Sequence, residues 1–315
     1  MVTVIMSESG ADELLSVFQS EQELLARVTQ VVVWKQGEAR APHKPLLLLW
    51  ALARIQRGEE RLFSYADLEE PLANLLVDFG PSRRSYHPEY PFWRLQNDGI
   101  WEIPERELLI EAISDRRRQG DVPPAILHQH RARGGFSEEI DARLRANPVL
   151  LERITHAILY AHFPASIHDD ILDAVGMDWL PVDRRPRSAG FRDLILRIYE
   201  HRCAICGYDG RLGRSDLAID AAHIRWHAHG GPDQPDNGLA LCSFHHKALD
   251  RGALGIDDDR RILVSQDVHG SHMVEELLLR FSRTELRSPQ SGQPLPAAAF
   301  IRWHQRHVFH RPARI

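Results

Sequence analysis

Hydrophobic residues in the first eighty positions recur at the three- and four-residue spacing of amphipathic helices. This spacing predicts helices at residues 12–34, 45–55 and 65–79, and Gly80-Pro81 ends the third. The same pattern returns at residues 136–163. The N-terminal part of the chain is therefore predicted to be mainly helical.

Two aromatic-rich runs, at residues 92–95 and 100–103, interrupt this helical pattern. Their composition favours β-strands, and Asp98-Gly99 between them is a strong hairpin-turn signal. We therefore expect a β-hairpin here. It would give the helical domain one small sheet, an α+β architecture.

The hydrophobic pattern thins between residues 164 and 188, and residues 181–186 read as an extended connector. A short amphipathic helix follows at 191–200. A chain of 315 residues is also long for one ordinary domain. The expected organisation is a domain at residues 1–165, a linker at 166–188 and a second domain at 189–315.

Composition and charge exclude several classes of protein. The chain is 43% hydrophobic and 26% charged, and no apolar run reaches the roughly 20 residues that a membrane span needs. The first residues lack a basic leader and a sustained apolar segment, so we expect a cytoplasmic protein without a membrane partner. The net charge of −5 argues against a protein that coats nucleic acid indiscriminately, so DNA contacts would use local basic patches.

All three cysteines fall in two closely spaced pairs of ligand residues. Cys203 and Cys206 form the first pair, and Cys242 and His245 form the second. Two such pairs are the ligand pattern of a tetrahedral structural zinc site, which stabilises a region too irregular to build its own core. The sequence therefore predicts a structural Zn²⁺ ion in the second domain.

Three further residues lie within and just beyond the zinc-ligand pairs: His223, Asn237 and His246, at separations of 14 and 9 residues. With the cysteine pairs, this segment resembles the zinc-stapled variant of the HNH endonucleases, which have a ββα-metal fold. The resemblance covers about residues 191–255. It implies a DNA nuclease in the C-terminal domain.

The resemblance also implies a role for each residue. His223 is the expected general base, since a neutral imidazole with a pKa of about 6.5 can accept a proton. Asn237 is expected to hold the loop and to orient that imidazole through its amide. His246 and Asp250 are four residues apart on a helix, so they share one face and can bind one divalent ion.

The chain departs from the family pattern at Ala222, where many HNH enzymes carry a metal-binding Asp or His. A role for the nearby Asp220 stays open. A mixed nitrogen and oxygen site with a single ion agrees with a relaxed choice among Mn²⁺, Co²⁺, Ni²⁺ and Mg²⁺.

Two stretches of the first domain, residues 40–49 and 85–101, resemble the sulfur-binding domain of the McrA-like type IV restriction endonucleases, which depend on phosphorothioated DNA. The family's sulfur pocket implies roles here for His43, Lys44, Tyr90 and Pro91. Its apolar floor gives a sulfur atom dispersion contacts, whereas an ordinary phosphate oxygen would lose its hydration there.

The rim of this pocket is less regular than its floor. The family often has Arg at the position of Lys44 and a small residue where Arg94 falls. The preceding loop supplies further candidates for contacts with the bases or the backbone. They are Arg83, Arg84, Ser85 and Tyr86.

Together these features predict a restriction endonuclease that binds double-stranded phosphorothioate DNA and cuts nearby. One alternative is an HNH nuclease that depends on methylated bases, for which Trp93 and Trp101 would supply an aromatic cage. Another is a DNA-binding protein that keeps the HNH fold only as a zinc scaffold. Whether two chains form a homodimer is left open.

Overall fold

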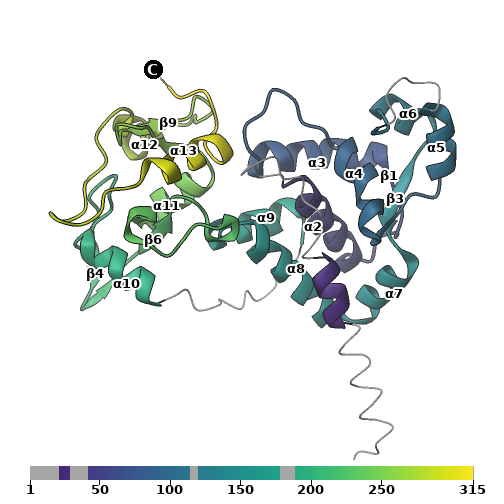
Figure 1. Cartoon of the computed structure of the whole chain (residues 1–315), viewed down its shortest axis with the longest axis horizontal. Coiled ribbons are helices and arrows are strands. Elements are labelled where there is room, and N and C mark those ends of the chain that lie inside the picture. The colour runs from purple at the N-terminus through teal and green to yellow at the C-terminus, as the bar shows by residue number, and fades with distance from the viewer. Residues whose placement is uncertain (1–20, 29–41, 114–119, 178–188, 315) are drawn as a thin grey trace, which may run out of the picture.

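The computed structural model describes residues 21–28, 42–113, 120–177 and 189–314 (Figure 1). Buried apolar side chains form two clusters, one mainly before residue 178 and the other entirely after residue 190. We call residues 21–177 the N-terminal unit and residues 189–314 the C-terminal unit. Residues 181–186, where the sequence predicts a connector, lie outside the described residues.

The N-terminal unit is mainly helical, with one small sheet. After a helical segment at 21–28, its helices are α2 (His43–Gln56), α3 (Tyr65–Phe79), α4 (Glu89–Arg94), η1 (Leu95–Asp98), α5 (Arg106–Ile113), α6 (Pro124–Gln129), α7 (Glu138–Ala146), α8 (Pro148–His162), η2 (Ala165–Ile167) and α9 (His168–Val175). Its strands β1 (Phe63–Ser64), β2 (Trp101–Glu102) and β3 (Arg133–Phe136) pair antiparallel in the order β1-β3-β2. The predicted α+β character and the helices expected at 45–55 and 65–79 are confirmed, whereas the helix expected at 12–34 lies largely outside the described residues.

Helix α2 is the centre of this unit. Its residues from Pro45 to Ala53 are all buried, because α3, α4, α7, α8 and α9 pack around it. Helix α3 starts at a capping serine, since the hydroxyl of Ser64 accepts a hydrogen bond of 3.1 Å from the backbone N–H of Asp67. Within the described ranges, no helix is both long enough and apolar enough to cross a bilayer.

The β-hairpin predicted at residues 92–103 is wrong, because its first half is helical. Helix α4 has Pro88 at its N-cap and Pro91 in its first turn, where a missing N–H costs little. Phe92 is fully buried and packs edge-on against Tyr65. Gly99 has a φ of 70° and ends η1, so Asp98-Gly99 terminates a helix instead of turning a hairpin.

The C-terminal unit is built around two antiparallel strands and one helix. Strands β6 (Ile219–His223) and β7 (Gly238–Cys242) pair over their full length, and α11 (Ser243–Asp250) packs against both. The predicted ββα arrangement is confirmed. The other elements are α10 (Ala189–Ile198), β4 (Arg211–Leu212), β5 (Ser215–Asp216), η3 (His227–His229), η4 (Pro235–Asn237), β8 (Leu254–Ile256), β9 (Ile262–Val264), α12 (His272–Leu277), η5 (Leu279–Phe281) and α13 (Ala298–His307).

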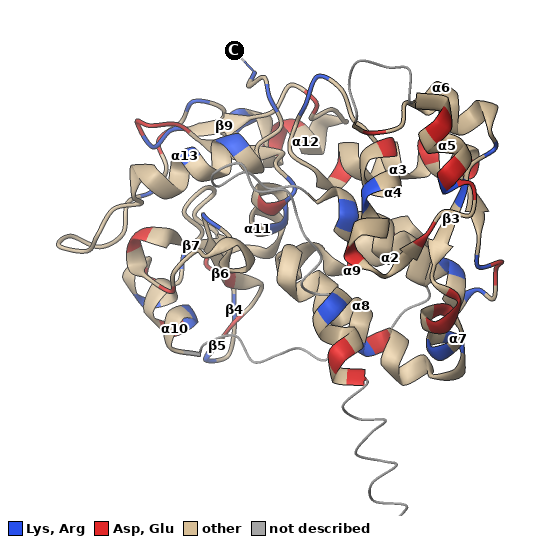
Figure 2. Ribbon diagram, turned by 45° about the vertical axis from the view of Figure 1, so that its right-hand side comes forward, with Lys and Arg blue, Asp and Glu red and all other residues tan. Residues whose placement is uncertain are grey.

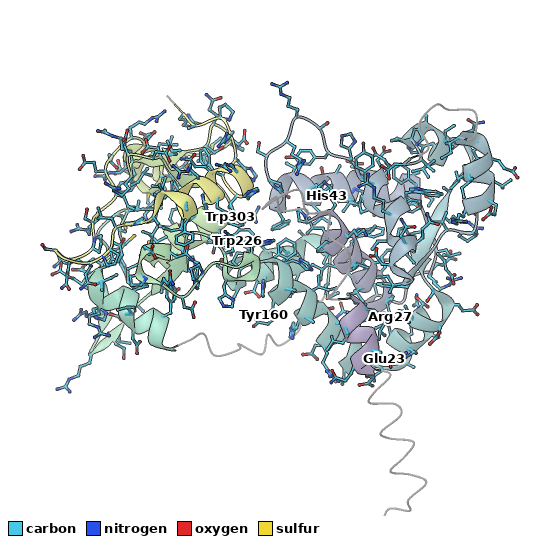
Figure 3. All side chains as sticks on the ribbon, in the orientation of Figure 1. Glu23, Arg27, His43, Tyr160, Trp226 and Trp303 are labelled. Atoms are coloured by element: carbon cyan, nitrogen blue, oxygen red, sulfur yellow. The ribbon has the colours of Figure 1, made fainter. Side chains whose placement is uncertain are left out.

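The two units pack against each other through apolar side chains. Trp226 and Trp303 of the C-terminal unit are buried in the N-terminal core, and Figure 3 shows both on the side that faces α8 and α3. Helix α9 also belongs to that core, through Ile171, Leu172 and Val175. Part of the segment expected to be a linker, 166–188, is therefore folded into the N-terminal unit.

Candidate active site

The sequence-predicted zinc ligands lie together at one end of the β6–β7 pair. One ligand atom from each of Cys203, Cys206, Cys242 and His245 lies within 4.8 Å of the others. His245 turns Nδ1 toward the sulfurs, 3.1 Å from Cys242 Sγ, while its Nε2 lies 2.8 Å from the carbonyl oxygen of Leu277. Because that carbonyl holds the proton on Nε2, Nδ1 is free to bind a metal. The four residues fit a structural zinc ion.

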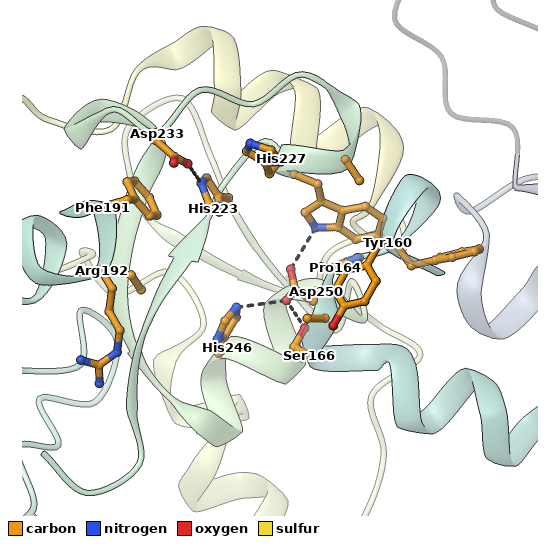
Figure 4. A pocket seen from close by; sticks show the side chains of 15 residues that line it. Tyr160, Pro164, Ser166, Phe191, Arg192, His223, His227, Asp233, His246 and Asp250 are labelled. Atoms are coloured by element: carbon orange, nitrogen blue, oxygen red, sulfur yellow. Dashed lines mark hydrogen bonds and ion pairs between the residues drawn. The ribbon is translucent and has the colours of Figure 1, made fainter. Parts of the chain in front are cut away.

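His223 ends strand β6 at the opposite end of the pair from the zinc ligands. Its ring stacks on Phe191 of α10, with centroids 4.1 Å apart, and its Nε2 lies 2.8 Å from Asp233 Oδ1 (Figure 4). Burial lowers the pKa of His223, and Asp233 acts in the opposite direction. The balance favours the neutral imidazole that a general base requires.

Asn237 is fully buried and closes the loop between β6 and β7. Its amide donates to the carbonyl oxygens of Arg225 and Pro232, each at 3.0 Å, and its Oδ1 accepts from the N–H of Arg225 at 2.9 Å. Both amide protons are thus used on the loop. The expected amide contact with His223 is not made, and Asp233 takes that place instead.

His246 and Asp250 lie one above the other on α11, as their spacing predicts. His246 Nε2 is 3.2 Å from Asp250 Oδ2, and both side chains are buried. Two neighbouring ligand atoms that bind the same divalent ion at about 2.1 Å lie about 3 Å from each other. The separation of His246 Nε2 and Asp250 Oδ2 therefore fits such an ion. Asp220 approaches the other nitrogen of His246, with its Oδ2 4.0 Å from Nδ1.

Asp250 has contacts that the sequence did not predict. Its Oδ1 accepts a 2.9 Å hydrogen bond from the indole N–H of Trp226, and its Oδ2 accepts one from the hydroxyl of Ser166. Burial opposes the ionisation of Asp250, but the charge of His246 and the hydrogen bonds from His246 and Ser166 keep its pKa below the usual value. Asp250 is thus a fixed carboxylate.

A cavity of about 420 Å³ joins these residues and opens between the two units. His223, His246 and Asp250 line it from the C-terminal unit, and Tyr160 and Ser166 line it from the N-terminal unit (Figure 4). The candidate base and the two metal-binding candidates therefore share one cleft. Asp233, Trp226 and Ser166 could not be found from motif spacing, because the folded loop and the packing of the units bring them there.

The residues predicted for the sulfur pocket lie around the start of α2 and along α4. His43 and Lys44 form the first turn of α2, which packs against α4 (Figure 3). Tyr90 is half-buried between the ring of His87, stacked at 4.6 Å, and the guanidinium of Arg94, 4.6 Å from its centroid.

The cations of this region differ in their availability. Lys44 Nζ pairs with Asp98 at 2.6 Å, and the uncharged Pro91 nearby is buried. Arg94 forms a two-pronged ion pair with Asp121. By contrast, the loop from α3 to α4 exposes Arg83, Arg84 and Ser85 and leaves Tyr86 half-buried.

Comparison with known proteins connects both units to described families. The profile "ScoMcrA-like, DNA sulfur-binding domain" matches residues 21–180, and the profile "HNH endonuclease" matches residues 203–257. No curated protein matched the chain.

Several solved structures are similar to parts of it. The sulfur-binding domain of ScoMcrA complexed with phosphorothioated DNA is 22% identical, with a TM-score of 0.41, over 49% of this chain and 94% of that one. The sulfur-binding and SRA domains of ScoMcrA, also with phosphorothioated DNA, are 22% identical, with a TM-score of 0.43, over 63% of this chain and 68% of that one. The modification-dependent restriction endonuclease TagI is 28% identical, with a TM-score of 0.29, over 42% of this chain and 41% of that one.

Proposed function

Because the chain belongs to the family of ScoMcrA-like DNA sulfur-binding domain proteins and also carries an HNH endonuclease domain, we propose that it restricts phosphorothioate-modified double-stranded DNA. The N-terminal unit would bind the modified linkage. The C-terminal unit would hydrolyse phosphodiester bonds nearby. The observation that carries the nuclease half is the convergence of His223, His246 and Asp250 in one cleft.

Each of these residues would have a separate role in hydrolysis. With the Nε2 proton held by Asp233, Nδ1 of His223 is the basic nitrogen, and it takes a proton from the attacking water. His246 and Asp250 would hold the divalent ion, which supplies positive charge beside the scissile phosphate and the leaving oxygen. Asn237 keeps the loop closed, so that Asp233 stays beside the base.

Sulfur selection follows from the partly apolar surroundings of Tyr90 and Pro91. Sulfur is larger and less hydrated than oxygen. It therefore loses less hydration free energy when these side chains cover it. Lys44 and Arg94 are already ion-paired, so we assign the charge that meets the phosphates to the exposed Arg83 and Arg84.

Charge distribution favours the same side of the N-terminal unit for DNA. Acidic residues lie on α5 and at the start of α7, at the end of this unit far from the nuclease (Figure 2). They would repel a duplex there. The loop from α3 to α4 lies nearer to the C-terminal unit (Figure 1). A duplex bound at this loop would therefore run toward the cleft.

The packing of Trp101 argues against the methylated-base alternative. Trp101 is 4% exposed and packs edge-on against Phe63 and Phe136 in the core. It is therefore unavailable for an aromatic cage around a flipped base.

The test is digestion of duplexes that differ only in sulfur. Four polymerase products of one template, each made with a different α-thio nucleotide, carry the modification in every sequence context of that base, and a fifth product carries only oxygen. The zinc-loaded full chain with Mn²⁺ should cut at least one thio product and leave the oxygen product intact. Equal cutting of all five would remove the sulfur dependence and keep the nuclease, whereas no cutting of any would remove both.

A further inference from the structure

Ser166 belongs to the N-terminal unit but reaches the candidate metal site of the other unit. It lies in η2, between α8 and α9, and the next residue, Ile167, is buried in the N-terminal core. Its hydroxyl donates a hydrogen bond to Asp250 Oδ2 (Figure 4). These two residues are 84 positions apart in the sequence.

The bond from Ser166 completes a set of contacts that fixes the carboxylate of Asp250. Trp226 holds Oδ1, and Ser166 holds one side of Oδ2, while His246 faces that oxygen at 3.2 Å. A carboxylate oxygen has two lone pairs, so Oδ2 can accept from Ser166 and still turn the second pair toward His246. Asp250 is 3% exposed, and water cannot replace the serine freely.

The packing of the two units holds Ser166 in place. Asp170 on α9 pairs with Lys247 of α11 at 2.7 Å and with Arg251, the residue after that helix, at 3.2 Å. His229 Nε2 lies 3.2 Å from the carbonyl oxygen of His162, at the end of α8. Contacts thus tie the units together on both sides of η2.

We propose that Ser166 is a positioning residue of the nuclease, through which the DNA-reading unit supplies part of the metal site. This proposal rests on the nuclease function assigned to His223, His246 and Asp250. Groups that hydrogen-bond a metal-binding carboxylate fix its orientation, and their loss typically lowers metal affinity or activity about 10- to 100-fold. The serine orients Asp250 so that its oxygen and His246 Nε2 face the same point.

Three variants of the zinc-loaded full chain test this role. Ser166→Ala removes the hydroxyl, and Ser166→Thr keeps it. Ser82→Ala removes another hydroxyl that crosses between the units, since Ser82 donates to the carbonyl oxygen of Arg311 at 3.5 Å, away from the cleft. For each protein, Mn²⁺ binding without DNA is measured by electron paramagnetic resonance, with His246→Ala as the background.

Cleavage of a modified duplex is then followed against Mn²⁺ concentration. Ser166→Ala should weaken Mn²⁺ binding and raise the half-saturating concentration for cleavage by about tenfold, while its affinity for modified DNA stays at the wild-type value. Ser166→Thr should restore most of the Mn²⁺ affinity and of the cleavage, and Ser82→Ala should bind Mn²⁺ like the wild type.

Wild-type Mn²⁺ binding in Ser166→Ala would overturn the proposal. So would faster cleavage by that variant, because the hydroxyl would then block the site. An equal loss in the Ala and Thr variants would assign the effect to packing and also overturn it. A wild type that cuts without regard to sulfur would contradict the proposed function but not this result, because Mn²⁺ binding is measured without DNA.

Discussion

Asp233 lies beside His223, the proposed general base, with its Oδ1 2.8 Å from the imidazole Nε2. Asp233 follows the Gly230-Gly231 turn and returns to the strand end at which the loop began. The carboxylate selects the tautomer whose basic nitrogen is Nδ1. We therefore assign the role of orienting the proposed base to Asp233, and Asn237 shapes the loop that carries it.

We predict that Asp233→Asn moves the acidic limb of the pH–rate profile to lower pH. The base works when neutral, so the rate falls as pH drops through the pKa of His223, which burial already holds below its ordinary value. Asp233 raises that pKa, so removing its charge lowers it further. The amide still accepts the Nε2 proton, and we expect a plateau rate lower by about tenfold or less. Single-turnover cleavage between roughly pH 5 and pH 9 measures the shift. A limb that moves to higher pH would contradict the assignment.

His223→Ala and Asn237→Ala should differ in their effect on stability, although both lower cleavage. His223→Ala removes the base, for which a loss of about 10²- to 10⁴-fold is expected, and leaves DNA binding and folding nearly unchanged. Asn237→Ala removes three hydrogen bonds of the loop, two with the backbone of Arg225 and one with the carbonyl oxygen of Pro232, at about 0.5–1.5 kcal/mol each. Its free energy of unfolding should drop by several kcal/mol. Denaturant titration compares the two, and equal stability would mean that Asn237 does not hold the loop.

Cys203→Ser should release about one zinc ion per chain and lower the melting temperature of the C-terminal unit, because structural zinc is coupled to folding. His245→Ala should behave alike, since its Nδ1 is 3.6 Å from Cys203 Sγ. The matched control is His246→Ala, one residue along the same helix but outside the cluster, which should retain its zinc. Elemental analysis of the purified proteins measures the metal. A wild type that folds fully without zinc would refute the site.

Tyr90→Ala should bring the affinities for sulfur and oxygen duplexes of one sequence close together. It removes the aromatic surface of the proposed pocket and leaves the exposed cations that bind phosphates. Arg84→Ala should weaken binding to both duplexes and reduce the slope of affinity against salt by about one. Titrations of each variant at two salt concentrations measure these effects. If the wild type binds both duplexes equally well, the surface around Tyr90 does not recognise sulfur.

Local sequence signals predicted the parts of the structure that depend on neighbouring residues. Gly80-Pro81 predicted the end of α3, and the helix does end at Phe79. The HNH and cysteine spacings likewise located the β6–β7–α11 frame. The strand predicted at residues 92–95 was wrong, because the buried packing of Phe92 in a helix outweighs the β-propensity of aromatic residues. Ser166 and Asp250 meet only because two folded units dock, and no spacing within the sequence encodes that contact.

The edge-to-face pair of Trp226 and Trp303, 6.0 Å between ring centroids, gives the molecule an optical signal at the boundary between its units. Both rings are shielded from water by the N-terminal core, and they are two of the seven tryptophans in the chain. Any opening of the cleft wide enough to wet them would shift their fluorescence to longer wavelengths. Because the indole of Trp226 also donates to Asp250, a paramagnetic ion bound beside that carboxylate would quench the same emission. The unlabelled protein can thus report both the separation of its units and the loading of its cleft.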